Sequence, residues 1–339
     1  MAAGETSGYQ DGPGSDARFD TVEGAVSMGN DLYVSDAGNA VIRRVNLQTG
    51  AVSTFAGAAG KGDSVDGNLT AARFYKPGPI VAAAATLYVA QLGTEHGGAC
   101  IRSIDLAGQK VSTVAGDCKR KGNLDGAPGA ALFMSPRAMA LDGSTLYVGD
   151  STRIRAVALP GGAVSTVAGE PDAQCTFGLQ RICKGGFTDG AGTDARLTGI
   201  RAMAISGRTL YVVDGDAVRA FDLDAKRLTT VIGRARSNGS KDGVDAQAEI
   251  LNVGAILPSS GGLLLLQTTT FAGLRYLNLA TKTLASLTGL AMPAFVRGSS
   301  NVDGPAAKAD FKNPRHLVQA GERVLIIHDH GRIRTFEKF

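Results

Sequence analysis

Short segments of alternating apolar and polar residues run along the whole chain, separated by glycine-rich turns. Residues 19–36, FDTVEGAVSMGNDLYVSD, show the arrangement: an apolar segment, a Gly29-Asn30 turn, and a Leu32-Tyr33-Val34 strand. This pattern predicts a β-hairpin. Counterparts of the Leu-Tyr-Val strand recur at 87–89, 146–148, 210–212, 264–265 and 325–326.

Each hairpin belongs to a longer repeat that occurs six times. Every copy opens with Asp-Gly, has an alanine six residues after the aspartate and a bulky apolar residue two positions further on. The aspartates are Asp11, Asp66, Asp125, Asp189, Asp242 and Asp303, and the bulky residues are Phe19, Phe74, Phe133, Leu197, Ile250 and Phe311. After the hairpin come an Ile-Arg strand and a Ser-Thr-Val-Ala-Gly strand. We interpret each Asp-Gly as a turn, or as a cap that starts a short helical stretch.

Four strands per copy at a period of ~50 residues predict a β-propeller. The fold class is therefore all-β, a six-bladed propeller with four-stranded antiparallel blades. We expect one domain over 1–339, with copies at about 8–57, 62–116, 121–169, 185–233, 239–289 and 299–339. The sixth copy ends within or just after its third strand, so the last blade is expected to lack a full outer strand. An open strand edge favours self-association.

The repeat resembles that of the NHL-repeat family, most clearly in PRAMALDGSTLYVGDSTRIR of the third copy and its counterparts. The resemblance covers nearly the whole chain, and it is closest to bacterial and extracellular members with the Asp-Gly interblade motif. It implies that ligands bind on the face formed by the interblade loops and the loops joining second to third strands. Such propellers include RNA-binding, protein-binding, sensor and lyase members, so the fold does not fix the function.

The composition argues against a nucleic-acid partner and against a membrane span. The net charge of +4 and pI near 8.9 are mild, tryptophan is absent, and aromatic residues make up 6%. A nucleic-acid partner is therefore not expected. No apolar run approaches the ~20 residues that span a bilayer. The first residues, MAAGETSGYQDG, contain no apolar signal core, so any secretion signal lies outside this chain.

The four cysteines fall into two local pairs. Cys100 and Cys118 stand about equally far from the turn near Gly108-Gln109, which places them opposite each other across a hairpin. Cys175 and Cys183 bracket the insertion CTFGLQRIC. We expect two disulfides and an extracytoplasmic location, secreted, periplasmic or at the cell surface. A metal site is the alternative, but no CxxC pair or nearby histidine supports it.

Two positions in each hairpin carry candidate chemistry when the copies are aligned without gaps. The positions face each other in the pairs Glu23/Asp36, Gly78/Gln91, Arg137/Asp150, Arg201/Asp214, Gly254/Gln267 and Arg315/His328. Arginine thus faces aspartate twice, which predicts structural salt bridges across the hairpins. Glu23 opposite Asp36 needs a cation, a shared proton or an adjacent arginine. We favour arginine, from Arg43 or Arg315, over a metal.

One arginine per copy begins the third strand: Arg43, Arg102, Arg155, Arg219, Arg275 and Arg334. We expect them to bond to the neighbouring aspartate. Where Gln91, Gln267 or His328 replaces that aspartate, Arg102, Arg275 and Arg334 are expected to be available to an anion or another carboxylate.

The prediction is a non-catalytic propeller that binds a protein or a small acidic or glycan ligand at the channel mouth. The candidate ligand-binding residues are Glu23, Arg137, Arg201, Arg315, His316, His328 and Arg334. One alternative is a metal-dependent hydrolase or lyase, lactonase-like, with Glu23, Asp36 and His328 as catalytic residues. Glu23 and Asp36 would then hold Ca²⁺ or Mg²⁺; otherwise we expect no cofactor. Another alternative is an inert repeat scaffold.

The enzyme alternative has specific weaknesses. Lyases of the resembling family hold a metal with histidines from several blades, whereas three of the four histidines here, His316, His328 and His330, lie in one copy. Lactonase-type propellers hold Ca²⁺ with Glu, Asn and Asp from separate blades, and only Glu23 and Asn252 stand at comparable positions. No Gly-x-Ser-x-Gly elbow is present.

Overall fold

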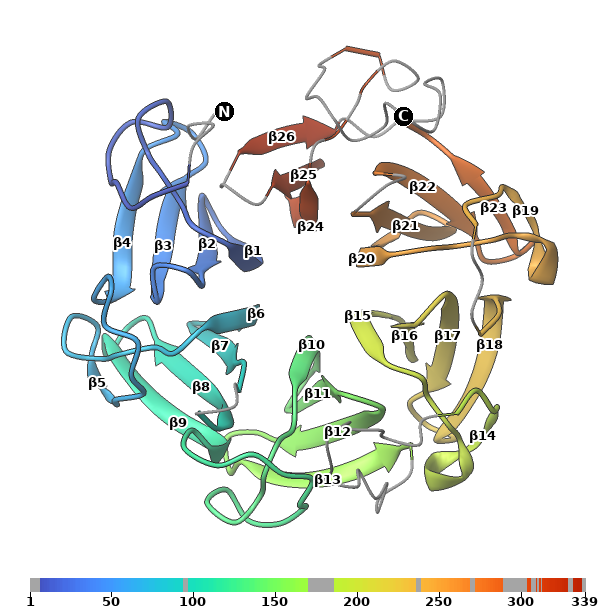
Figure 1. Ribbon diagram of the computed structural model, residues 1–339, viewed down its shortest axis with the longest axis horizontal. Coiled ribbons are helices and arrows are strands. Elements are labelled where there is room, and N and C mark those ends of the chain that lie inside the picture. The colour runs from blue at the N-terminus through green and yellow to red at the C-terminus, as the bar shows by residue number, and fades with distance from the viewer. Residues whose placement is uncertain are drawn as a thin grey trace, which may run out of the picture.

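The strands of the chain form six antiparallel sheets arranged as blades around a central axis (Figure 1). The computed structural model describes residues 7–93, 97–169, 186–235, 239–268, 272–288, 313–328 and 332–336, with residues 304, 305, 309 and 311. The protein is an all-β, six-bladed propeller, as predicted. Its helical content in the described residues is two 3-10 turns, η1 (Gly192–Asp194) and η2 (Asp245–Gln247). No helix among these residues is long and apolar enough to cross a bilayer.

In the first five blades four strands follow one another outward from the axis. They are, in blade one, β1 (Val22–Met28), β2 (Asp31–Asp36), β3 (Val41–Asn46) and β4 (Val52–Gly57); in blade two, β6 (Pro77–Ala83), β7 (Thr86–Gln91), β8 (Ala99–Asp105) and β9 (Lys110–Asp117); in blade three, β10 (Pro136–Asp142), β11 (Thr145–Asp150), β12 (Arg153–Ala158) and β13 (Ala163–Ala168). In blade four they are β15 (Ile200–Ser206), β16 (Thr209–Asp214), β17 (Ala217–Asp222) and β18 (Arg227–Gly233), and in blade five β20 (Val253–Ser259), β21 (Gly262–Gln267), β22 (Gly273–Asn278) and β23 (Thr283–Ser286).

The sixth blade has three strands within the described residues. They are β24 (Pro314–Ala320), β25 (Arg323–His328) and β26 (Ile333–Phe336). This agrees with the expectation of a last blade short of an outer strand. Three two-residue strands, β5 (Gly67–Asn68), β14 (Gly190–Ala191) and β19 (Gly243–Val244), add to the rims of blades two, four and five.

The core lies between neighbouring blades, because each sheet buries both faces. Phe19, Leu32 and Val34 of blade one pack with Val318, Leu325 and Ile327 of the last blade, and all six are at most 5% exposed. The predicted Gly29-Asn30 turn is present: Met28 pairs with Asp31, and Gly29 has a φ of 59°. Glycine reaches this left-handed conformation at no steric cost, which allows the two-residue hairpin.

Short helical turns follow the Asp-Gly motifs of blades four and five, as expected, but the aspartate does not cap them. The residues that precede η1 and η2 are Ala191 and Val244, and neither turn has a side-chain cap. Instead, the Asp11 carboxylate accepts a hydrogen bond from the Thr54 backbone N–H on β4 at 3.0 Å. Asp66, Asp125, Asp189 and Asp242 accept the same bond from Thr113, Thr166, Thr230 and Ser286. The motif thus attaches each interblade segment to the outer strand of its own blade.

Candidate functional site

A fully buried arginine is the third or fourth residue of the third strand in each of the first five blades. We call Arg43, Arg102, Arg155, Arg219 and Arg275 the frame arginines. Arg43 donates to the carboxylates of Asp11 and Asp36 at 2.6 and 3.0 Å, and its guanidinium lies 4.7 Å from the centre of the Phe19 ring. Each of the other four also bonds to the aspartate of its own Asp-Gly motif, at 2.6 to 2.7 Å.

Arg102 and Arg275 each bond to another carboxylate, one of the two outcomes expected, and are buried away from an external anion. Arg102 donates to Gln91 Oε1 at 2.8 Å as well as to Asp66, so glutamine replaces aspartate as its acceptor. Arg275 donates to Asp242, the Ser240 hydroxyl and the Glu249 carbonyl. Both are buried, and burial lowers their pKa while the aspartates oppose that shift.

Arg334 of the last blade occupies the corresponding place. It is 9% exposed, and its guanidinium lies 4.7 Å from the centre of the Phe311 ring. Its position matches that of the frame arginines on Phe19, Phe74 and Phe133. The structure therefore gives this candidate ligand-binding residue the surroundings of a structural arginine.

The aspartates that end the second strands are buried with these arginines. Arg43, Arg155 and Arg219 reach Asp36, Asp150 and Asp214 at 3.0, 3.1 and 2.9 Å. Burial raises the pKa of Asp36 and Asp150, although hydrogen bonds donated by the Asn39 side-chain amide and the Ser135 backbone N–H oppose the shift. These carboxylates also accept backbone N–H groups at the entrance to the first strand, such as that of Asp20 at 2.8 Å.

The predicted pairs across the hairpins are wrong, because every first strand has an irregularity at its start. Asp36 pairs with Val22 rather than Glu23, and the register then shifts so that Gly24 pairs with Ser35. In the same way Asp150 pairs with Pro136, and Asp214 pairs with Ile200. Glu23, Gly78, Arg137, Arg201, Gly254 and Arg315 lie at these irregularities, and we call them the bulge positions. A bulge residue has no partner in the hydrogen-bonded ladder between the two strands. Its side chain therefore does not face the residue that it would oppose in a regular strand.

The two glycine bulges have a steric cause that sequence reasoning missed. A Cβ on Gly254 would lie 2.4 Å from the Thr268 side chain, and one on Gly78 would lie 2.7 Å from Leu92. Leu92 and Thr268 directly follow Gln91 and Gln267 in sequence, and both line the central cavity. The Arg-bearing blades three and four have Ser151 and Gly215 at this place. In these four blades a small residue at the bulge position goes with a larger residue after the second strand, and an arginine goes with a small one. This inverse relation in size is the sequence signal that could have revealed the packing.

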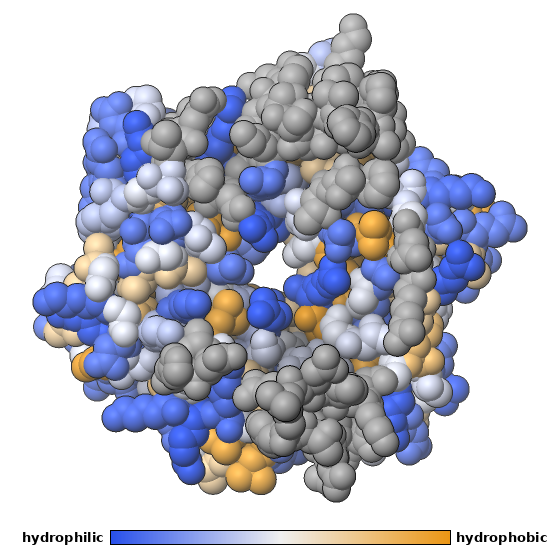
Figure 2. Space-filling model, viewed as in Figure 1, coloured by the Kyte–Doolittle hydropathy of each residue, from blue (hydrophilic) through white to orange (hydrophobic). Residues whose placement is uncertain are grey.

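Five of the six bulge positions line the mouth of a central cavity of about 600 Å³. Glu23, Arg137, Arg201, Gly254, Arg315 and His316 all line it. Figure 2 shows the hollow centre of the disc with strongly hydrophilic residues around it. The order of blades places β10 opposite β24 and β1 opposite β15 (Figure 1). Arg137 and Arg315 thus belong to opposed strands, as do Glu23 and Arg201.

We call Arg137, Arg201 and Arg315 the mouth arginines. The hydrogen bonds of two of them differ from those of the frame arginines. Arg137 donates to the Ser135 hydroxyl at 3.1 Å, and Arg201 donates to Asn252 Oδ1 of blade five at 3.0 Å. Both arginines are exposed, and in the described part of the chain their bonded partners are neutral. His316 Nε2 lies 3.3 Å from the Val22 carbonyl oxygen, next to Glu23 in sequence. The predicted Arg137–Asp150 and Arg201–Asp214 salt bridges do not form, because Asp150 and Asp214 bond to frame arginines.

The register shift in blade one also separates two residues of the alternative catalytic cluster, Glu23 and Asp36. Glu23 lines the cavity, whereas Asp36 is fully buried and bonded to Arg43 and Asn39. Across the described ranges no group of three His, Cys, Asp or Glu residues is arranged to hold a metal ion. The side chain of His328 and all of His330 lie outside the described residues.

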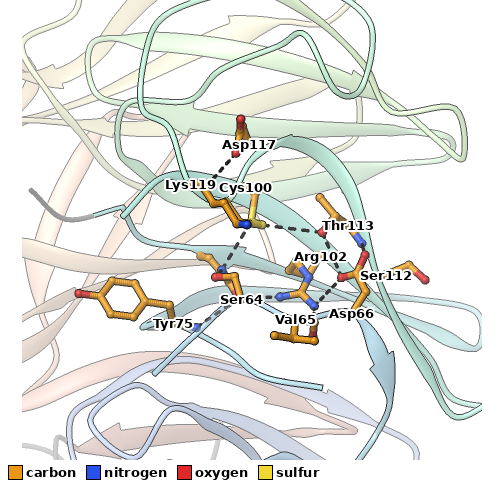
Figure 3. Close-up of a disulfide and its surroundings, with 12 residues drawn as sticks. Ser64, Val65, Asp66, Tyr75, Cys100, Arg102, Ser112, Thr113, Asp117 and Lys119 are labelled. Carbon is orange, nitrogen blue, oxygen red and sulfur yellow. Dashed lines mark hydrogen bonds and ion pairs between the residues drawn. A yellow bond between two sulfur atoms is a disulfide. The ribbon is translucent and has the colours of Figure 1, made fainter. Parts of the chain in front are cut away.

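The Cys100–Cys118 disulfide is present, with 4.9 Å between the Cα atoms. It lies beside Arg102 and Thr113 of blade two (Figure 3). Gln91 Nε2 is 3.5 Å from Cys100 Sγ, and Thr113 Oγ1 is 3.8 Å from Cys118 Sγ. The predicted Cys175–Cys183 bridge lies outside the described residues.

Comparisons with known proteins agree with this architecture. No protein-family model matches the chain. The chain is 28% identical, over 331 residues, to NHL repeat-containing protein 2 of Bos taurus, an alignment that covers 89% of this chain and 44% of the relative. The chain is an NHL-repeat-like six-bladed β-propeller. This NHL-like propeller thus spans less than half the length of that relative.

Solved structures share the fold of the NHL-like propeller at low sequence identity. One is a protein of unknown function from Bacteroides thetaiotaomicron, with a TM-score of 0.69 and 15% identity over 99% of this chain and 74% of that one. Another is an auxiliary nutrient binding protein of the same organism, with a TM-score of 0.64 and 14% identity over 98% and 74%. At these identities the likeness concerns the fold alone.

Proposed function

We propose that this propeller is a non-catalytic binding domain that takes an anionic ligand at the channel mouth. The observation that carries the proposal is the placement of Arg137, Arg201 and Arg315 on bulges around one cavity. The frame arginines tie each interblade segment to its own blade, whereas Arg137 bonds to Ser135 and Arg201 reaches Asn252 of blade five. A cavity of about 600 Å³ is of the size that small ligands occupy in proteins.

Electrostatics supports an anion. Glu23 is the acidic residue among the bulge positions, against three arginines. Arg137 and Arg201 bond to neutral oxygens of Ser135 and Asn252 within the described chain, so their charges are not balanced there by a carboxylate. A carboxylate or phosphate group can accept charge-assisted hydrogen bonds from both. The proposed ligand is accordingly a small acidic molecule, an acidic glycan or an acidic segment of a protein.

The setting we propose is extracytoplasmic, with residues 1–339 acting as one propeller domain. The Cys100–Cys118 disulfide supports an oxidising compartment.

Two alternatives have less support. A metal-dependent hydrolase or lyase would use Glu23, Asp36 and His328, but the carboxylate of Asp36 is bonded to Arg43 and Asn39 away from the cavity lining. An inert scaffold that associates through the edge of the last blade predicts oligomers, and native mass spectrometry tests for them.

The test is titration calorimetry with citrate and oxalate against wild type, Arg137→Gln, Arg201→Gln and Arg227→Gln. Arg227 is an exposed arginine on the outer strand β18, outside the cavity, and serves as the matched control. We expect each channel substitution to weaken binding by roughly tenfold, since a hydrogen bond to a charged group contributes ~1.5–3 kcal/mol. Equal affinity in all four proteins would contradict the proposal, as would the failure of citrate, oxalate and octanoate alike to bind.

A further inference from the structure

The wall of the cavity changes character below the bulge positions. Every lining residue there is apolar apart from His316 and Gln319. The wall consists of Ala25, Val26, Ile80, Val81, Met139, Met203, Ile256, Leu257, Leu317 and Val318, with small residues such as Ala138, Ala202 and Ala255 just below the mouth. A cationic rim therefore stands above an apolar wall.

The apolar wall follows from the strand register. After each bulge the first strand continues without a break. Three successive residues line the cavity in blade five, Ala255–Ile256–Leu257 of β20, and in blade one, whereas blades three and four contribute two each. Three residues of strand cover roughly 10 Å at ~3.3 Å per residue. The apolar wall thus continues for about that depth below the arginines.

This arrangement fits one class of ligand. A compact polyacid would satisfy the arginines but would leave the wall in contact with water. A molecule with one anionic group and an unbranched apolar body would satisfy both, because each methylene that leaves water for the wall adds binding energy. We infer that the ligand is a small amphipathic anion, with its head group between the mouth arginines and its apolar body along the channel. The inference rests on the proposed function, which requires only the anion.

A homologous series separates the two proposals. Acetate, butyrate and octanoate share one head group and differ in the body, octyl phosphate exchanges the head group, and octanol lacks the charge. We expect affinity to rise by roughly threefold per methylene from acetate to octanoate. Octanol should bind at least about tenfold more weakly than octanoate. Octyl phosphate against octanoate shows which head group the arginines prefer.

Two variants locate the apolar body. Val26 is a partly buried residue of the wall, and Val26→Thr keeps its shape while replacing one methyl group with a hydroxyl. This variant should weaken octanoate binding by about fivefold and leave acetate unchanged. Val231→Thr on β18 is the matched control, because Val231 is also partly buried but lies outside the cavity. Melting temperatures show whether either variant alters the fold, and the wild-type series stands without them.

Each outcome decides between the proposals. Equal affinity for acetate and octanoate overturns the amphipathic ligand and leaves anion binding in place. Octanol binding as tightly as octanoate overturns both, since charge then contributes nothing. If the series does not bind while citrate or oxalate does, the apolar body is excluded and the proposed function stands.

Discussion

A buried arginine is stable in this fold because several acceptors surround it. Arg43 donates to two carboxylates and to the carbonyl oxygens of Gln10 and Arg18, and it stacks on Phe19. Burying a charge without such partners would cost several kcal/mol. The partners come from three separate parts of one repeat, so the arginine ties the interblade segment to its blade.

Removing the Asp-Gly carboxylate should lower the free energy of unfolding more in blade two than in blade three. Arg102 has Asp66 as its bonded carboxylate, whereas Arg155 has both Asp125 and Asp150. We expect Asp66→Asn to lower the free energy of unfolding by about 2 kcal/mol, and Asp125→Asn to lower it by less, since Arg155 keeps a charged partner. Urea unfolding of the two variants measures the difference. Equal losses would show that the second-strand carboxylate does not compensate.

Gly254 allows a similar test of the channel packing. A Cβ at this residue would collide with Thr268 Cγ2, at 2.4 Å. Gly254→Ala should therefore destabilise the protein by about 1–3 kcal/mol, and adding Thr268→Ala should restore most of that loss. Thermal denaturation of both single variants and the double variant gives the coupling. Strictly additive effects would rule out the proposed contact.

At the scale of elements, the disulfide constrains the β8–β9 hairpin of blade two. It closes a loop with a sequence separation of 18 residues. Loop-closure entropy for that length predicts that Cys100→Ser/Cys118→Ser lowers the free energy of unfolding by about 3 kcal/mol. Denaturant unfolding with and without reductant checks this. The reduced wild type should match the double variant, and a stability unaffected by either change would contradict the prediction.

The hairpins could be predicted from the sequence, whereas the bulges could not. Alternation and turn residues such as Gly29-Asn30 are local signals, and the structure confirms them. The register shift occurs at the same place in every copy, so the copies still align without gaps and the sequence gives no sign of it. A slip of one residue changes the face of a side chain. Arg137 and Arg201 consequently face the channel instead of Asp150 and Asp214.

The bonding partners of the Asp-Gly aspartates could not be predicted from the residues near them in sequence. Asp125 bonds to Arg155 and Thr166, which follow it by 30 and 41 residues, so its partners depend on the blade being folded. The candidate mouth residues Glu23, Arg137, Arg201 and Arg315 were identifiable because they vary where the frame residues repeat. Leu92 and Thr268 were not, because their contribution depends on the size of a neighbour across the sheet.

At the scale of the whole molecule, the repeated frame predicts how stability depends on pH. Burial opposes the ionisation of Asp189 and Asp242, but hydrogen bonds from Thr230 and Ser286 and from the frame arginines outweigh it and hold their pKa below the ordinary value of 3.8. Near and below that pH the unfolded chain binds more protons, so stability is lost as pH falls. Above it, the full contribution of both carboxylates is present.

The measurement is the melting temperature from about pH 6 to about pH 2. Asp189→Asn/Asp242→Asn should have a lower melting temperature near neutrality and a shallower fall in acid than wild type. Burial gives Asp36 and Asp150 the opposite shift, and both proteins retain these two, so the difference between the curves isolates the Asp-Gly carboxylates. Parallel curves would exclude them as the source of acid sensitivity.

The bulges have a consequence for how such a protein can change. Four blades present a side chain to the channel mouth from a residue outside the hydrogen-bonded ladder, and glycine takes that place in blades two and five. The frame arginines and Asp-Gly carboxylates tie each interblade segment to its own blade. A substitution at a bulge position, with an adjustment at its neighbour after the second strand, changes the charge or shape of the mouth without touching these bonds. New specificities can therefore arise from independent single steps around the ring, in natural variation or in a designed library.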